Sequence, residues 1–181
     1  MVLLKDDSNA LSTIKGKLAS IVSELNEVDS SKAVELCDWY LEKAKYFNKH
    51  YKKERFQKLP QDIKRGDIVW VHMGINIGDE FSDHSTKGHF GLVWGQQGFM
   101  FHIIPLSKQG GPKSNTYIVD LGKIPGLPDN NTFAKLDNIR AVSIRRIKRI
   151  AGQPGGKIDL NTVDPTLVTK INDTVKDKFV I

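Results

Sequence analysis

Histidines are the side chains of this chain whose type and spacing best suit chemistry. His72, His84 and His89 lie close together, and His102 follows. Histidine titrates near neutral pH, so it can act as a general acid or base, and its neutral ring is a common metal ligand. We expect no metal site and no cofactor, because the spacing of these histidines is not that of a metal-binding motif. Because His102 alternates with Ile103 on an apolar segment, we expect it to be a hydrogen-bonded core residue.

Positive charge is concentrated in one segment of the chain. The formal net charge is +6, and residues 43–58 hold seven bases against the single acid Glu54. Such a cluster attracts phosphate groups at long range. A solvated helix face is the simpler interpretation of a lone basic helix. RNA contact is the alternative, with Lys49, Lys52 and Lys53 as the candidate residues.

The composition indicates a folded domain that does not cross a membrane. Of the 181 residues, 39% are hydrophobic and 27% are charged, which is typical of globular proteins. The apolar runs are too short to span a bilayer, and acids follow the apolar N-terminus too closely for a secretory signal. The single cysteine, Cys37, has no partner for an internal disulfide, which favours a cytoplasmic location. Its place in a helical apolar pattern predicts a small buried side chain.

Residues 1–60 are predicted to form a helical hairpin. Apolar residues at helical spacing predict a first helix over 8–27, with Ser8 as its N-cap. Asp29 and the two serines after it can cap a second helix that runs to about residue 57. Pro60 then ends the helical pattern. The predicted apolar stripe of the second helix consists of Val34, Leu36, Trp39, Tyr40, Ala44, Phe47 and Tyr51.

Residues 61–181 are predicted to form a small β domain that ends in a helix. The segment 67–73 is apolar on both faces, which is typical of a strand buried on both sides. Short strand patterns follow at 89–94, 99–106, 116–121 and 139–144, each bounded by turn residues. Gly95 to Gly98 predict a hairpin turn between two of them. Asp164-Pro165 opens the last helix, with Leu167, Ile171, Val175 and Phe179 on one face.

Five segments of the β domain occur in the order found in a known family. They read KRGDIVWV, NIGDEF, HFGLVW, IIPLS and LDNIRAVSIRRI. In this order they resemble the MazF/PemK toxins, over about residues 62–181. The resemblance implies an α+β fold, namely an SH3-like barrel with a C-terminal helix. It further implies a homodimer that cuts single-stranded RNA, such as mRNA, without metal, and that is neutralised by a cognate antitoxin protein. In that reaction the ribose 2′-OH attacks its own phosphate and leaves 2′,3′-cyclic phosphate and 5′-OH ends.

The resemblance also implies the catalytic positions. The family's serine or threonine at the end of the third strand falls on Ser107, and its second-strand arginine falls on His89. Arginine clamps a phosphate with two parallel bonds, whereas histidine is the better general acid or base. His89 could therefore keep the chemistry by another route, with Lys87 as the fixed positive charge. Glu80 is either a base that borders the groove or a cap of its loop.

Further residues are candidates for RNA contact. Phe81 lies in the polar loop that borders the family's groove, where it could stack on a base. Lys108 follows the catalytic serine position. Arg140 lies in the best-matched segment, where an inward ion pair or a loop-bracing role is at least as plausible as RNA contact. The competing hypotheses are a non-catalytic SH3-like module that binds RNA or a protein, and a related toxin that acts on a protein.

The helical segment over residues 1–60 is an addition to the family pattern. It is predicted to pack or dimerise, to extend the RNA-binding surface through the bases of residues 43–58, or to lie in the groove as an antitoxin does. Antitoxin segments that enter the groove are usually acidic. The basic end of this hairpin therefore favours nucleic acid over self-inhibition.

Overall fold

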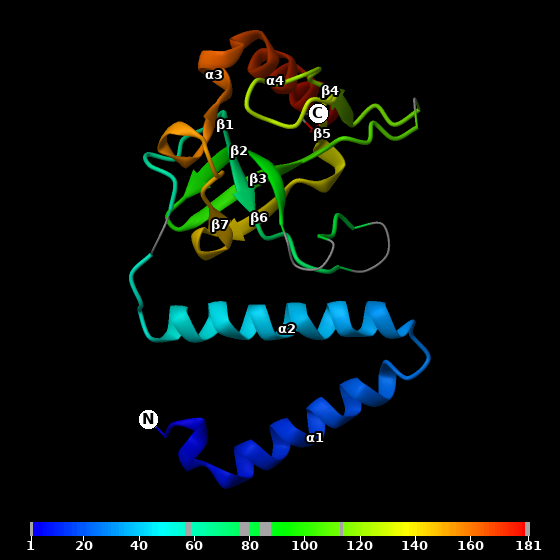
Figure 1. The fold of residues 1–181 in the computed structure, drawn as a ribbon, viewed down its shortest axis with the longest axis vertical. Helices are drawn as coiled ribbons and strands as arrows, with labels where there is room; N and C mark the ends of the chain where they lie inside the picture. Colours follow the sequence, from blue (N-terminus) through cyan, green and yellow to red (C-terminus); the bar gives the residue numbers. More distant parts are fainter. Residues whose placement is uncertain (1, 57–58, 77–79, 84–87, 113, 180–181) are drawn as a thin grey trace.

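The computed structural model describes residues 2–56, 59–76, 80–83, 88–112 and 114–179. Within these ranges the chain is an α+β protein with an antiparallel sheet of eight strands and four α-helices. Figure 1 shows the two N-terminal helices at one end of the sheet and the two C-terminal helices at the other. No helix among the described residues has the length and apolar character needed to cross a membrane.

The helices are α1 (Ser8–Glu24), α2 (Ser30–Tyr51), α3 (Leu160–Val163) and α4 (Pro165–Phe179). The longer strands are β1 (Asp67–Val71), β2 (His89–Gln97), β3 (Met100–Ser107) and β6 (Arg140–Ser143). The shorter strands are β4 (Ile118–Asp120), β5 (Phe133–Lys135), β7 (Ile147–Lys148) and β8 (Ile158–Asp159).

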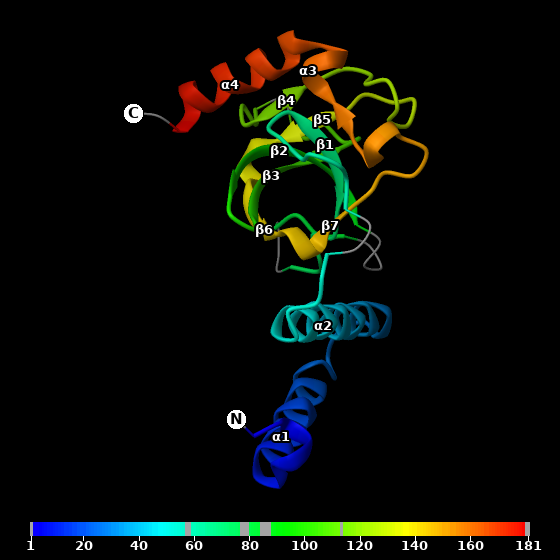
Figure 2. The same ribbon diagram turned by 90° about the vertical axis from the view of Figure 1, so that its left-hand side faces the viewer.

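The sheet curls strongly without closing. Its main path runs β4-β5-β3-β2-β1-β7, with β6 also paired to β3 and β8 also paired to β1. Figure 2 shows how these strands bend around a common interior. β6 and β7 pair with different strands of the sheet and are consecutive in the chain. A short 3-10 turn, Ile144–Arg146, joins β6 to β7. The two strands are therefore connected along the chain, and no hydrogen-bonded pairing between them occurs among the described residues.

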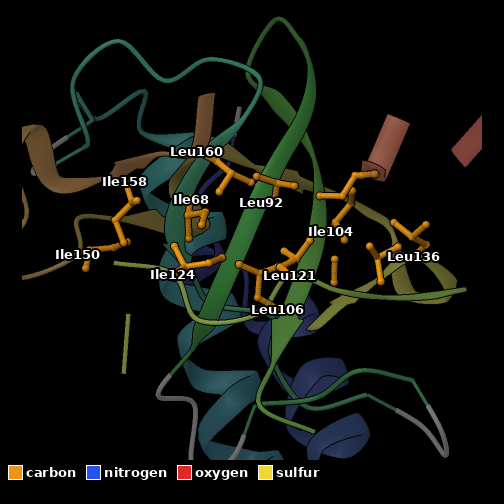
Figure 3. Close-up of a cluster of buried hydrophobic side chains, with 13 residues drawn as sticks. Ile68, Leu92, Ile104, Leu106, Leu121, Ile124, Leu136, Ile150, Ile158 and Leu160 are labelled. Atoms are coloured by element: carbon orange, nitrogen blue, oxygen red, sulfur yellow. The ribbon is translucent and has the colours of Figure 1, made fainter. Parts of the chain in front are cut away.

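Each face of the curled sheet carries its own core. The inner core includes Val69, Val71, Val93 and Ile103. The outer core lies between the sheet and the C-terminal segment and includes Ile68, Leu92, Ile104, Leu106, Leu160 and Ile171 (Figure 3). Because alternate residues of β1 enter the two cores, this strand is buried on both sides, as its sequence predicts.

The strand from Met100 to Ser107 corrects two predictions. The turn before it is at Gly98 and Phe99, because β2 continues to Gln97 through an irregularity between Val93 and Gly95. Gly98 has a positive φ of 58°, which glycine adopts without strain. His102 is exposed, not a core residue, because strand alternation turns it away from the side occupied by Phe101 and Ile103.

Helix α2 lies across one end of the sheet, whereas α1 leads away from it (Figures 1 and 2). The only residue of α2 that is buried among those described is Trp39. Its indole packs against Gly74, and the guanidinium of Arg146 lies 5.0 Å from the ring centre. Asp29 caps this helix by accepting hydrogen bonds from the backbone N–H groups of Ser31 and Lys32.

The apolar stripes of the two N-terminal helices are mostly exposed in the single chain. None of the described residues of α1 is buried, and Ile14, Leu18 and Val22 of its apolar stripe are exposed. Most of the α2 stripe is also exposed, including Val34, Tyr40, Phe47 and Tyr51. Cys37 is exposed, not buried, since it lies off the narrow contact made by Trp39. The N-cap of α1 is Asp7 rather than Ser8, because the Asp7 carboxylate accepts from the Ala10 N–H.

Candidate functional site

The largest described cavity lies at the edge where β2 begins and β3 ends. Its volume is about 410 Å³. Trp70, Phe90 and Leu127 supply apolar walls, whereas Gln109, Asn130 and Thr132 supply polar groups. Phe81, His89, Ser107 and Lys108, all singled out from the sequence, also line it.

The strand register explains why His89 and Ser107 meet here. β2 and β3 are antiparallel, and Gly91 pairs with Pro105. His89 opens β2 and Ser107 ends β3, each two residues beyond this pair. In antiparallel neighbours, the start of one strand and the end of the other lie at the same edge of the sheet. The sheet therefore brings an imidazole and a hydroxyl to the lining of one cavity.

A buried carboxylate holds the His89 ring. Nδ1 of His89 lies 3.0 Å from Oδ1 of Asp83. The Asp83 side chain has no exposed surface, whereas 33% of the His89 side chain is exposed. A carboxylate at Nδ1 favours the tautomer that carries its proton on that nitrogen. This leaves Nε2 as the nitrogen free to accept a proton from a ligand.

Asp83 is itself fixed by the end of β1. Its Oδ2 accepts hydrogen bonds from the backbone N–H groups of Met73, at 2.5 Å, and Gly74, at 2.9 Å. The Asp83 N–H donates back to the Gly74 carbonyl at 2.8 Å. A buried carboxylate is stable only when its lone pairs are satisfied in this way. The histidine is thus oriented by a group with little freedom to move.

The described part of the loop before β2 is braced around this pair. The Asn76 side chain donates to the Phe81 carbonyl at 2.7 Å, and the Phe81 N–H donates to Oδ1 of Asn138 at 2.9 Å. The Phe81 ring meets the His89 ring edge to face, with 4.7 Å between centroids. Phe81 is therefore part of the wall that positions the imidazole as well as a lining residue of the cavity.

Two partly buried arginines surround the carboxylate. Burial lowers the pKa of Arg140 and of Arg146, and the negative charge of Asp83 partly opposes this effect in both. Nε of Arg146 donates to the His72 carbonyl at 2.6 Å, so this arginine braces the end of β1. Among the described residues, Nε of Arg140 is buried without a hydrogen-bond partner. Glu80 is exposed, and its charge raises the pKa of Arg140.

Other candidates from the sequence lie elsewhere. Lys49, Lys52 and Lys53 are at the C-terminal end of α2 and do not line the cavity. Neither do Glu80 and Arg140. Lys87 and His84 lie outside the described residues.

His72 serves the junction between the sheet and α2. Its Nδ1 lies 2.6 Å from the Tyr46 hydroxyl. Over the described ranges, no three side chains of histidine, cysteine, aspartate or glutamate come together as a metal site.

No protein-family model and no curated protein matches this chain. The assignment of function therefore depends on the site itself and on the resemblance of the five sequence segments.

Asp83 is a residue of the candidate site that sequence reasoning missed. The strand patterns placed His89 at the start of one strand and Ser107 just after the next, but the predicted turn at Gly95 to Gly98 did not give the observed register, which has an irregularity between Val93 and Gly95. Asp83 gave no such signal, because it belongs to a loop without periodic pattern. Its contact with His89 depends on how that loop folds back on Gly74.

Proposed function

We propose that this protein is a metal-independent endoribonuclease of the MazF/PemK type, with the curled sheet as an SH3-like barrel. The observation that carries the proposal is the His89–Asp83 pair at a cavity shared with Ser107. A carboxylate that orients an imidazole is the arrangement used when histidine must transfer protons.

In the proposed reaction, Nε2 of His89 takes the proton of a ribose 2′-OH. The 2′-oxygen then forms a bond to the adjacent phosphorus, and the bond from phosphorus to the 5′-oxygen breaks. The leaving oxygen needs a proton, which the imidazolium of His89 can return. Asp83 remains hydrogen-bonded to Nδ1 and keeps the ring oriented during both transfers.

The remaining residues of the site suit the phosphate and the base. The Ser107 hydroxyl and the Lys108 ammonium can stabilise charge on the non-bridging oxygens. Phe81 and the apolar walls of Trp70 and Phe90 can pack against a base that is unstacked from its neighbours. Gln109 and Asn130 can donate to and accept from its polar edge, so base selectivity is expected at this cavity.

The partners of this activity follow from the resemblance. We propose single-stranded RNA as the substrate, a second copy of the chain as the homodimer partner and an antitoxin protein as the inhibitor. Light scattering on the purified chain measures the homodimer directly, and a monomer at all concentrations would contradict it.

The proposed activity can be tested by incubating a long mixed-sequence RNA with purified protein in excess EDTA. We expect discrete cuts with cyclic-phosphate and 5′-OH ends. His89→Ala should abolish them, and Ser107→Ala should slow them on the order of 10²-fold, as expected for loss of one hydrogen-bond donor. His102→Ala is the matched control, because His102 is exposed on β3 away from the cavity.

Two results would overturn the nuclease proposal. One is intact RNA with the wild-type protein. The other is a set of cuts that persists in His89→Ala, which would indicate a contaminating nuclease. RNA binding without cleavage would instead support a non-catalytic module.

A further inference from the structure

A second cavity lies between the C-terminal end of α2 and the edge strand β7. Its volume is about 220 Å³. Lys49, Glu54 and Arg55 line it from the helix side, and Arg145 and Lys148 line it from the sheet side. The residues that line this cavity and those that line the cavity beside His89 do not overlap.

The lining of this cavity is strongly cationic. Four bases, Lys49, Arg55, Arg145 and Lys148, face one acid, Glu54. Among the described residues, none of the five forms an ion pair within 4.0 Å. Cations gathered around a cavity without neutralising partners leave a positive potential for an anion to occupy.

The guanidinium of Arg145 is held by two described contacts, whereas its Nε has no described hydrogen-bond partner. Its guanidinium lies 4.8 Å from the centre of the Phe56 ring, and one terminal nitrogen donates to the Glu54 carbonyl at 2.9 Å. Its Nε is buried without a hydrogen-bond partner among the described residues. A planar guanidinium positioned in this way can donate to a phosphate oxygen.

The two lysines repel each other across the cavity. Burial lowers the pKa of Lys148, and the charge of Lys49 lowers it further. The Lys148 ammonium also lies 5.2 Å from the centre of the Tyr46 ring. An anion between these groups would relieve the repulsion and increase the stability of the charged forms.

We propose that this cavity binds a backbone phosphate of single-stranded RNA, at a distance from the His89 site. The phosphate chemistry follows from the four cations, and the choice of RNA as its source rests on the proposed function. Such a second contact would hold a long RNA on the enzyme without reading its sequence.

Binding should be measured by fluorescence anisotropy with a labelled mixed-sequence RNA oligonucleotide. All variants carry His89→Ala, so that cleavage does not affect the result. Lys49→Gln with Lys148→Gln should weaken binding on the order of tenfold at moderate salt, and should reduce the slope of log K against log salt by about 0.7, the value for one phosphate of a single strand. Lys15→Gln with Lys17→Gln on α1 removes the same charge from exposed positions outside the cavity and should leave both values unchanged.

The outcomes separate the possible ligands. Equal affinity and slope in the two double variants would overturn the second site. If inorganic phosphate raises the Tm of the protein through Lys49 and Lys148 while RNA affinity is unaffected, the site takes free phosphate and the RNA occupant is wrong. Thermal unfolding of each variant shows that the fold is retained.

Because no cleavage is measured, an inactive wild-type protein would overturn the nuclease proposal without affecting this result. Conversely, cleavage by the wild-type protein with unaltered binding in the variants would overturn only the second site.

Discussion

The cavity beside His89 and the cationic cavity beside α2 differ in how their polar groups are held. At the larger cavity, a buried carboxylate that accepts hydrogen bonds from the backbone N–H groups of Met73 and Gly74 fixes one imidazole. At the smaller one, four cations surround the space, and Arg145 and Lys148 each lie against an aromatic ring of the lining. A single oriented group suits proton transfer, whereas several charges around one space suit phosphate binding.

The proposed proton-transfer residues and the main cluster of positive charge also lie in different segments of the chain. Residues 43–58 carry seven bases against one acid, whereas His89 lies at the start of β2 and Asp83 in the loop before it. We therefore expect substitutions at the His89 site to reduce cleavage without weakening RNA binding, and substitutions at the cationic cavity to weaken RNA binding. The following changes test that separation, beginning with the largest expected effect.

Asp83→Asn should lower the cleavage rate on the order of 10³-fold, as expected for loss of the orienting carboxylate. The amide oxygen can still accept from Met73 and Gly74, but the amide nitrogen would donate to His89 and force its proton onto Nε2. Single-turnover cleavage measures the effect, and RNA binding should remain within twofold of the wild-type value. Asp173→Asn, on the exposed side of α4, is the control. A wild-type cleavage rate for Asp83→Asn would show that the carboxylate does not orient the base.

Trp39→Ala should reduce the free energy of unfolding by about 3 kcal/mol, since a buried indole is lost. This change should affect both cavities. Helix α2 lines the cationic cavity, and it packs on Gly74, which holds Asp83 beside the other cavity. Chemical denaturation measures the stability. Tyr40→Ala removes a neighbouring aromatic side chain that is 44% exposed, and its effect should be much smaller. Equal effects of the two substitutions would mean that α2 is not docked through Trp39.

Acidification should weaken the junction between α2 and the sheet. Burial lowers the pKa of His72 from its usual value of 6.5, and the charge of Lys148 lowers it further. The unfolded chain therefore binds the proton more readily, so the stability is present above pH 6.5 and is lost as the pH falls below it. Protonation also removes the lone pair of Nδ1 that can accept from the Tyr46 hydroxyl. The other groups that act on His72 are Asp83, Glu42 and Arg146.

The change in Tm between pH 7.5 and pH 5.5 measures this effect. We expect a fall on the order of 2 °C from this group, kept small because the side chain is partly exposed. His72→Asn keeps an acceptor for Tyr46 but does not titrate, so it should show a smaller fall. An identical fall in both proteins would assign the pH dependence to other groups.

The sequence predicted the regular elements better than it predicted contacts between them. The α1, α2 and α4 helices and the strands β1, β2, β3, β4 and β6 correspond to periodic patterns in the sequence. The two-residue strands β7 and β8 and the three-residue strand β5 were missed, because segments so short carry no periodic signal.

Burial was the least predictable property. Helical spacing placed apolar residues such as Leu18 and Phe47 on one face, but it could not show that the sheet covers little more than Trp39. At the site, His89 and Ser107 lie at the ends of strands that the sequence patterns predicted, but the register between these strands includes an irregularity that alternation does not show. The Asp83 contact depends on a loop conformation, which local pattern does not determine.

Gly74 contacts both helix α2, through Trp39, and the candidate site, through Asp83. Its N–H and carbonyl bond to Asp83, and a methyl group in place of its hydrogen would lie 2.2 Å from the Trp39 ring. The residue can carry no side chain while α2 is docked. A chain trimmed at Pro60 would keep every candidate catalytic residue but would leave this backbone without its cover. A fragment that keeps the candidate site intact is therefore expected to include α2 and to begin upstream of Asp29.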